Sequence, residues 1–286
     1  MSDQDTRESC ASAGSCDRSS CEGCPSANGA KPDFSVPMNS ESDIKHVIGI
    51  VSGKGGVGKS MITAASATMM RKAGKNVGIL DADVTGPSIP TMYGVKGPLV
   101  ATPNGSYPAV AEDGTKVMSI NLILDSADTP VIWRGPVIAG VIKQFWEEVI
   151  WGDLDYLFVD MPPGTGDVPL TVFQSLPLDG IIIVTSPQEL VELIVTKAYN
   201  MANMMDVPVL GIVENYSYVL CPDCGKHINV FGESRIDEIA EKFGIPVLAK
   251  LPMDPKLSSL SDSGRIFDMS TEPFETLKDK LGKIDG

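Results

Sequence analysis

Long apolar runs and positive charge are both scarce in this sequence of 286 residues. No stretch of roughly 18 or more apolar residues occurs, so no segment reads as a membrane-spanning helix. The formal net charge is −14, whereas a general nucleic-acid binder needs a basic face that displaces phosphate counterions. We therefore expect neither a nucleic acid nor a membrane as the main partner, although a local phosphate site is compatible with this charge.

The first residues also lack the apolar stretch of a secretory signal, because residues 1–8 are polar and acidic. We therefore expect a cytoplasmic protein. The chain contains six cysteines, and in a reducing compartment these stay thiols. This pattern favours metal ligation over disulfide bonds.

Large apolar residues are nearly absent from residues 1–45, which are rich in Ser, Asp, Gly and Cys. Such a segment cannot bury a core, so we expect a flexible Cys-containing extension and linker unless a metal orders it. Residues 46–286 are long enough for one large α/β domain with a buried core.

Apolar runs and helical gaps alternate along this second region. We expect strands at 47–51, 76–80, 117–121, 156–159, 180–185, 209–213 and 247–251. We expect helices at about 60–73, 136–150, 188–205, 233–243 and 271–282. Alternation of this kind predicts an α/β fold with a mostly parallel sheet that helices cover on both faces. Residues 84–116 contain many Gly and Pro and are expected to form an irregular excursion or hairpin.

A phosphate-binding motif follows the first expected strand. Residues 53–60 read GKGGVGKS and match the P-loop pattern G-x-x-x-x-G-K-[ST] between a buried strand and a helix. The glycines let backbone amides turn toward phosphate oxygens, and the helix N-terminus adds the positive end of its dipole. Lys59 is expected to reach the β- and γ-phosphates of ATP, and Ser60 to bind Mg²⁺. The expected nucleotide-binding residues of the loop are Gly53, Lys54, Gly55, Gly56, Val57, Gly58, Lys59 and Ser60.

Lys54 distinguishes this loop from a plain P-loop. A lysine directly after the first glycine resembles the deviant Walker A loop of the MinD/ParA class, which includes the arsenite-pump ATPases and the nitrogenase iron protein. In that class this lysine crosses a dimer interface to the partner's nucleotide. The resemblance therefore implies a homodimer that forms on ATP, with Lys54 in a catalytic role, and the alternative is a solvated loop lysine.

Three aspartates follow expected strands. Asp81 and Asp83 come at the end of the second strand, and Asp160 follows the apolar run 156–159 in the Walker B manner. Carboxylates at the C-terminal ends of parallel strands lie on the ligand side of such a sheet. Asp81 and Asp160 are candidates to hold the water shell of Mg²⁺. Resemblance to the class implies that Asp83 is the catalytic residue that positions the attacking water. For any one of the three aspartates, the alternative is a role as the N-terminal cap of a helix.

Several longer stretches resemble the Mrp family of iron–sulfur carrier ATPases, the group of bacterial ApbC and the cytosolic nucleotide-binding scaffolds. Besides the P-loop, they are LDADVTGPSIP at 80–90, WRGP at 133–136, DMPPGTGD at 160–167, ENYSY at 214–218 and CPDCG at 221–225. The resemblance covers about residues 46–270. It implies a nucleotide-switched scaffold that holds a transient iron–sulfur cluster and passes it to apo client proteins. It also implies that Asn215 hydrogen-bonds the adenine edge.

The cysteines fall into two groups. Cys221 and Cys224 can direct two thiolates at one metal, but a tetrahedral zinc site or a [4Fe–4S] cluster needs four ligands. A two-fold dimer supplies the missing pair, so we expect a bridging cluster. Three alternatives to this bridging cluster remain. His227 could be a third ligand, or the two cysteines could be a metal-free thiol pair or a disulfide in a turn.

The second group lies in the extension and has the spacing C-x5-C-x4-C-x2-C. Its members are Cys10, Cys16, Cys21 and Cys24. Four cysteines could close one cluster within a single chain, and in number they resemble the extension of the cytosolic scaffold subgroup. The C-x2-C pair stands last here rather than central, so zinc or no metal at all are alternatives.

The expected function is thus an ATP-binding and ATP-hydrolysing carrier that uses ATP, Mg²⁺ and a [4Fe–4S] cluster. A positioning switch of the MinD/ParA kind is one alternative. It would need an amphipathic basic helix, whereas the lysines of residues 271–286 are interspersed with acidic residues in a weakly apolar segment. The other alternative is a redox protein like the nitrogenase iron protein, with a stably bound cluster.

Overall fold

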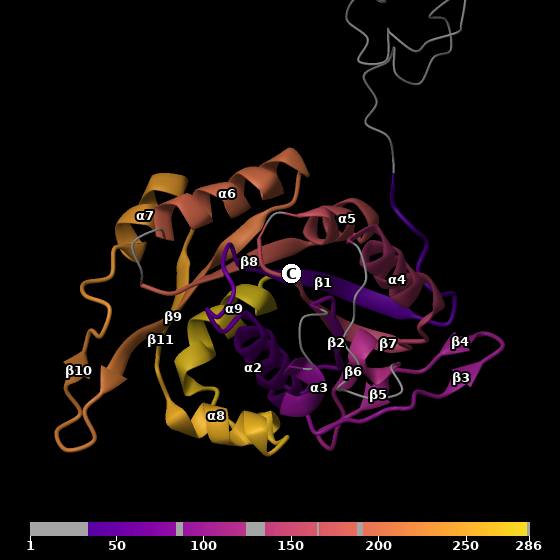
Figure 1. Cartoon of the computed structure of the whole chain (residues 1–286), viewed down its shortest axis with the longest axis horizontal. Coiled ribbons are helices and arrows are strands. Elements are labelled where there is room, and N and C mark those ends of the chain that lie inside the picture. Colours follow the sequence, from indigo (N-terminus) through magenta and orange to yellow (C-terminus); the bar gives the residue numbers. More distant parts are fainter. Residues whose placement is uncertain (1–33, 84–87, 124–134, 165, 188–190, 285–286) are drawn as a thin grey trace, which may run out of the picture. The chain divides into compact units, whose positions relative to one another are not determined.

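A nine-stranded sheet forms the centre of the part of the chain that the structure describes (Figure 1). This computed structural model describes residues 34–83, 88–123, 135–164, 166–187 and 191–284. The strand order is β10-β9-β8-β1-β7-β2-β6-β5, and β11, outside this order, also pairs with β9. The strands are β1 (Asp43–Val51), β2 (Val77–Asp81), β5 (Ala109–Val110), β6 (Lys116–Ser119), β7 (Asp153–Asp160), β8 (Gly180–Thr185), β9 (Val209–Leu220), β10 (His227–Ile228) and β11 (Val247–Pro252).

Pairing among the central strands is parallel, as the alternation of elements predicts, and the two outermost pairs, β9–β10 and β5–β6, are antiparallel. A separate two-stranded hairpin joins β3 (Ala101–Thr102) to β4 (Gly105–Ser106). Parallel strands need long crossovers, which the helices supply. The α/β fold class predicted from the sequence is therefore confirmed.

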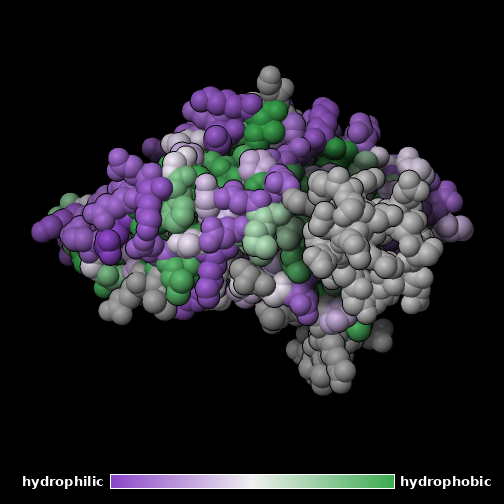
Figure 2. All heavy atoms as spheres, turned by 90° about the horizontal axis from the view of Figure 1, so that it is seen from above, coloured by the Kyte–Doolittle hydropathy of each residue, from purple (hydrophilic) through white to green (hydrophobic). Residues whose placement is uncertain are grey.

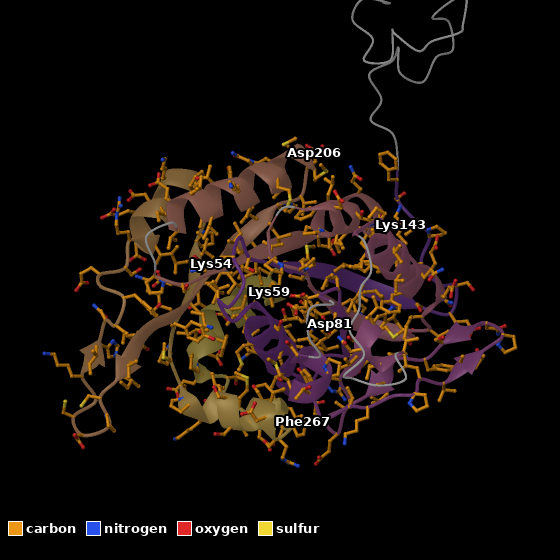
Figure 3. The ribbon with its side chains drawn as sticks, in the orientation of Figure 1. Lys54, Lys59, Asp81, Lys143, Asp206 and Phe267 are labelled. Carbon is orange, nitrogen blue, oxygen red and sulfur yellow. The ribbon has the colours of Figure 1, made fainter. Side chains whose placement is uncertain are left out.

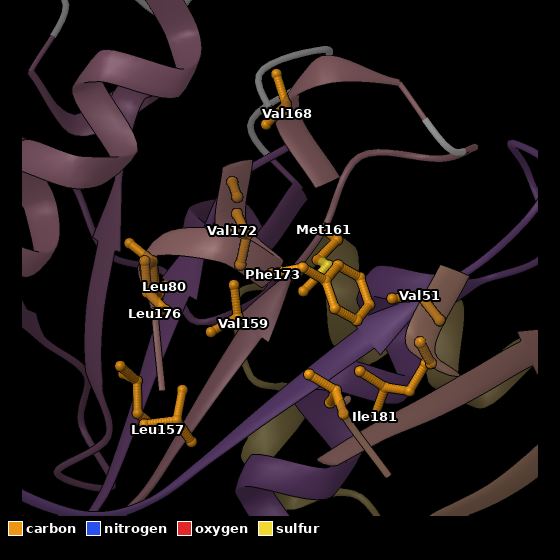
Figure 4. Close-up of a cluster of buried hydrophobic side chains, with 14 of the residues drawn as sticks. Val51, Leu80, Leu157, Val159, Met161, Val168, Val172, Phe173, Leu176 and Ile181 are labelled. Carbon is orange, nitrogen blue, oxygen red and sulfur yellow. The ribbon is translucent and has the colours of Figure 1, made fainter. Parts of the chain in front are cut away.

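Helices cover both faces of the sheet (Figure 1). They are α2 (Lys59–Lys72), α3 (Ser88–Met92), α4 (Gly135–Glu148), α5 (Asp167–Ser175), α6 (Val191–Met204), α7 (Ile236–Phe243), α8 (Pro255–Asp262) and α9 (Glu275–Gly282). Successive side chains of β7 alternate between two cores: Leu157 packs with the α4–α7 layer, and Phe158 packs with α2 and α9. Figure 4 shows the first core between the sheet and α5. Each fully buried large side chain of this kind contributes about 2–3 kcal/mol.

Several helices and strands begin or end at other residues than the sequence predicts. The strand expected at 209–213 continues to Leu220, and β1 and β7 begin earlier than expected. The strand expected at 117–121 ends at Ser119, where a 3-10 helix (Ile120–Leu122) begins. The helix expected at 233–243 starts at Ile236, and the one at 271–282 is a 3-10 turn (Glu272–Phe274) followed by α9. Sequence reasoning missed α3, α5, α8 and β10.

Residues 36–42 are bonded to the helix layer ahead of β1. The Trp146 indole donates to the Val36 carbonyl at 3.0 Å, and the Val36 amide donates to the Ser175 carbonyl at 3.2 Å. Close contacts within this compact unit therefore begin at Val36. The cysteines expected to bind metal in the extension lie outside the described residues.

The exterior of the protein is mixed in polarity. Hydrophilic side chains cover much of the face seen in Figure 2, with smaller apolar areas between them. Among the helices that can be described, none combines the length and the apolar composition needed to cross a bilayer.

Candidate functional site

The P-loop occupies the turn from β1 into α2, as its motif predicts. Gly56 and Gly58 have φ angles of 79° and 82°, in the left-handed region that glycine tolerates best. Gly58 is the residue before the first turn of α2. A Cβ at Gly58 would lie 2.2 Å from the Asn215 side-chain nitrogen, so both its backbone and its surroundings require glycine.

Lys59 is buried at the base of this loop, with 6% of its side chain exposed. Its ammonium donates to Asp160 Oδ1 at 2.8 Å and lies 3.4 Å from Asp83 Oδ2. Figure 3 shows Lys59 and Asp81 in the central part of the molecule. The folded chain therefore already holds one buried cation among the carboxylates that the sequence singled out.

Asp160 is the centre of a hydrogen-bonded cluster and is fully buried. Besides Lys59, the Ser60 hydroxyl donates to it at 2.6 Å and the Thr63 hydroxyl at 2.8 Å. Sequence reasoning missed Thr63, although its place one helical turn after Lys59 was a readable signal.

Asp81 lies directly beside Asp160, because β2 and β7 pair these two residues in register. Burial and the neighbouring Asp160 carboxylate raise the pKa of Asp81 well above its usual range. The Ser119 hydroxyl, which sequence reasoning also missed, donates to Asp81 Oδ2 at 2.8 Å and partly offsets this effect. The Asp83 amide donates to Asp81 Oδ1 at 3.1 Å.

This donor set fits a magnesium ion. One hydroxyl and three carboxylates gather at the C-terminal ends of β2 and β7, and hard oxygen ligands are what Mg²⁺ prefers. The Ser60 hydroxyl lies within hydrogen-bond distance of the Asp160 carboxylate, so both can face one hydrated ion.

A cleft of about 420 Å³ opens over the P-loop. Lys54, Lys59 and Ser60 line one side of it. Its remaining walls come largely from residues that sequence reasoning missed: Met92, Pro163, Tyr216, Ser258, Ser261 and Asp262. Lys54 is exposed at this cleft, and neighbouring Gly53 packs tightly, since a Cβ there would lie 2.5 Å from Ile194 of α6.

Asn215 lies on β9 and is buried against the P-loop. Its side-chain nitrogen donates to the Val57 carbonyl at 3.1 Å. The residue is therefore placed next to the nucleotide loop, and its bond to the adenine edge stays a prediction.

Cys221 and Cys224 lie in the turn that connects β9 with β10, outside the cleft. The turn is closed by the Cys221 amide, which donates to the Lys226 carbonyl, and by the Gly225 amide, which donates to the Cys221 carbonyl, each at 2.9 Å. Cys221 is half-buried and Cys224 is exposed, and both are free thiols. Amide donation from Cys224 and Asp223 to its sulfur lowers the pKa of Cys221.

In the described part of the chain, the cysteine pair has no third metal-binding side chain grouped with it. Among the described residues, no group of three or more His, Cys, Asp or Glu side chains could hold a metal ion. The His227 ring instead stacks on Tyr218, with centroids 4.0 Å apart and an interplanar angle of 5°. Within this part of one chain, the turn offers two ligands.

Comparison with known proteins identifies the family. The family model described as "NUBPL iron-transfer P-loop NTPase", of the ParA group, matches residues 43–284. An iron-sulfur cluster carrier protein of Methanocaldococcus jannaschii is 46% identical over 85% of this chain and 87% of its own length. One from Clostridium perfringens is 42% identical over 90% of this chain and 92% of its own length.

Solved structures agree with this result. A nucleotide-binding protein from Archaeoglobus fulgidus, solved in complex with ADP and with cobalt, has a TM-score of 0.72 and 45% identity, and covers 79% of this chain and 88% of its own. The cell division ATPase MinD of Pyrococcus furiosus has a TM-score of 0.58 at 20% identity, over 84% of this chain and 99% of its own, and shares the fold alone. The chain belongs to the family of iron-transfer P-loop NTPases.

Proposed function

We propose that this protein hydrolyses ATP as a homodimer and carries an iron–sulfur cluster to apo client proteins. The observation that carries the proposal is the separation of two sites on one chain. A buried cation–carboxylate cluster lies under a P-loop, and a pair of free thiols, one half-buried and one exposed, lies outside the cleft. The family description and the names of the relatives support the cluster as cargo.

In the proposed hydrolysis, the P-loop amides and Lys59 hold the β- and γ-phosphates of ATP. Bound Mg²⁺, held by Ser60 and by water on Asp81 and Asp160, would neutralise phosphate charge. Asp83 orients a water molecule whose oxygen attacks the γ-phosphorus. The bond from that phosphorus to the β–γ bridging oxygen breaks, and ADP and phosphate leave.

Two further residues complete the proposed nucleotide site. Lys54 is exposed at the cleft, and we propose that it reaches a nucleotide bound by the partner chain. Asn215 lies against the loop and is proposed to bond the adenine edge. Lys54 should accordingly matter for turnover in the dimer and little for ATP binding by one chain.

The cargo is proposed to be a [4Fe–4S] cluster shared between two copies. Cys221 and Cys224 from each chain give four thiolates, which is one ligand per iron. Exposure of the turn lets a client's thiolates replace them one at a time. We also propose a second cluster on Cys10, Cys16, Cys21 and Cys24, and a cytoplasmic location, where thiols stay reduced.

Cluster transfer is the experiment that tests this function. The protein is reconstituted anaerobically with iron and sulfide, then mixed with an apo-ferredoxin whose circular dichroism reports its own cluster. We expect the ferredoxin to gain a cluster while the donor loses one. A donor that keeps its cluster and, once reduced with dithionite, passes only electrons to an acceptor when ATP is added would instead be a redox protein of the nitrogenase-iron-protein kind.

A further inference from the structure

A single strand, β9, connects the nucleotide cleft with the cysteine turn. Its Asn215 side chain donates to the P-loop, and its Tyr216 lines the cleft. Two residues later, Tyr218 stacks on His227 at the base of the turn that holds Cys221. At about 3.3 Å per residue, roughly 16 Å of one strand separate Tyr216 from Cys221.

A bulge interrupts β9 where it passes the cleft. Glu214 pairs with Lys250 and Tyr218 pairs with Pro252, so three residues of β9 lie opposite one residue of β11. The middle one, Tyr216, has a φ angle of 59°. A bulky residue adopts this left-handed conformation only where its surroundings hold it there. Bulges of this kind re-aim side chains next to functional sites.

The P-loop is part of what holds the bulge. A Cβ built on Gly58 would lie 2.2 Å from the Asn215 nitrogen and 3.1 Å from the Tyr216 hydroxyl oxygen. These two side chains therefore pack directly on the glycine before α2. A group that binds at the P-loop therefore lies next to side chains of the bulge.

Glu214 links the other side of the bulge to the hairpin that β9 and β10 form around both cysteines, here called the cysteine hairpin. Its carboxylate is buried, with 1% exposed, and accepts hydrogen bonds from Ser217 at 2.6 Å and from Ser234 at 2.7 Å. Ser217 belongs to the bulge, whereas Ser234 lies on the segment that returns from β10 toward α7. The carboxylate thus closes the loop that contains both cysteines.

We propose that Glu214 and Tyr216 are positioning residues that couple nucleotide binding to the geometry of the cysteine turn. A nucleotide in the cleft contacts Tyr216, the bulge responds, and the Glu214 bonds pass the change to the hairpin. Coupling between two binding sites is reciprocal. A metal at the cysteines should therefore change the affinity for nucleotide by the same factor as nucleotide changes the affinity for the metal. The proposal deepens the carrier function above and rests on it for its biological meaning.

The test measures thiol reactivity, which needs no cluster. The full-length protein is alkylated with iodoacetamide with and without a saturating non-hydrolysable ATP analogue and Mg²⁺, and labelling of the Cys221–Cys224 peptide is followed by mass spectrometry. Saturation is verified for each variant by direct binding. We expect the nucleotide to change the wild-type rate about fivefold or more.

Three variants distinguish a loss of coupling from a general disturbance of the folded structure. Tyr216→Gly removes the ring and the backbone restraint, and Ser234→Ala removes one bond to Glu214, so both should bring the ratio of the two rates close to one. Asp206→Gly is the matched control, because Asp206 is the other described non-glycine residue with positive φ, at 58°, and lies in the turn after α6 (Figure 3). It should keep the wild-type ratio.

Two results would overturn the coupling. One is an alkylation rate of the wild type that is the same with and without nucleotide. The other is a ratio of these two rates that stays at the wild-type value in both Tyr216→Gly and Ser234→Ala. Iron reconstitution is run on unalkylated aliquots of the same preparations. A chain that never loads a cluster but keeps nucleotide-dependent thiol reactivity refutes the carrier function and leaves the coupling intact. The failures of the two ideas are therefore distinguishable.

Discussion

The nucleotide cleft and the cysteine hairpin are built on opposite principles. In the cleft, Lys59 and Asp160 are 6% and 0% exposed and are fixed by side-chain hydrogen bonds. In the hairpin, Cys221 and Cys224 lie in an exposed or half-buried turn closed by backbone bonds. Phosphoryl transfer depends on positioning, which burial supplies, whereas a cargo that must leave needs access.

The two regions also differ in completeness. Within the described residues, one chain supplies a phosphate loop, a lysine and three aspartates to the nucleotide site and two thiolates to the turn. The nucleotide site is thus nearly complete in a monomer, whereas the turn offers half of the four ligands that the proposed bridging cluster needs. This difference is the central claim, and each prediction below is chosen to break it or to sharpen it.

The largest effect is expected from Lys59→Ala. It removes the buried lysine that is proposed to meet the β- and γ-phosphates, and it takes from Asp160 the cation to which it is bonded. ATP affinity should fall on the order of 100-fold, and hydrolysis should drop below detection. Calorimetric titration and phosphate release measure both.

Lys72→Ala is the matched control for this variant, because Lys72 ends the same helix and bonds the Met269 carbonyl instead. It should bind ATP like wild type. Iron loading of the nucleotide-free Lys59 variant should stay within about twofold of wild type, because P-loop and thiols are separate sites. Normal ATPase activity in the Lys59 variant would contradict the P-loop assignment.

Asp83→Asn should separate binding from chemistry within the cleft. The amide keeps the shape and the backbone bond to Asp81 but loses the charge that orients water. We expect kcat to fall about 100-fold while the dissociation constant for ATP stays within about threefold. Single-turnover kinetics measure the two quantities, and a kcat near that of wild type would remove Asp83 from the mechanism.

The sequence predicted the cleft better than its surroundings, for a physical reason. The motif at 53–60 and the aspartates after β2 and β7 are local patterns, and they meet because parallel strands end at one edge. The continuation of β9 to Leu220 had no local signal, since the polar run Glu214–Ser217 interrupts the apolar one. Pairing with β10 and β11 extends that strand, and pairing is not local.

Helix α8, which forms part of the cleft wall, begins with a sequence pattern that could have predicted it. Asp254 caps this helix by accepting from the Lys256 amide at 2.9 Å, and Pro255 occupies its first position. An Asp-Pro pair is a typical helix start. The Ser-rich segment that follows, with one buried residue, hides the helix from any apolar pattern.

Removing the extension tests whether the hairpin is the whole metal site. If residues 1–33 hold one cluster per chain beside one bridging cluster, deleting them should lower the iron content per dimer by about two thirds. Stability and ATP binding should be unchanged, because the compact unit that holds the P-loop spans Val36–Gly286 and its Val36 is itself bonded to Trp146. Serine at Cys10, Cys16, Cys21 and Cys24 is the matched control for the deletion. Unchanged iron in both would show that these cysteines bind none.

The smallest effect is expected far from both regions, at Asp155. This carboxylate accepts from Lys45 and from the Asn76 amide, each at 2.8 Å, and these bonds lower its pKa. A folded pKa below the unfolded one gives stability that is present at neutral pH and is lost as the pH falls through the folded pKa.

Asp155→Asn should therefore cost about 0.5–1 kcal/mol of unfolding free energy near pH 7 and almost nothing at strongly acidic pH. Urea denaturation at the two pH values measures this, with ATP affinity and iron loading as controls. A loss of either function would mean that cleft and hairpin depend on general stability rather than on their own residues.

Iron counting against molecular mass tests the central claim most directly. A full-length chain with serine at the four extension cysteines retains only Cys221 and Cys224, so every thiolate-bound cluster must use them. After anaerobic reconstitution, native mass spectrometry should show about four iron atoms on a dimer and none on a monomer. A further Cys221→Ala or Cys224→Ala change should abolish loading while ATP binding persists. A monomer that carries a complete cluster, or either single variant that loads like its parent, would contradict the half-site account.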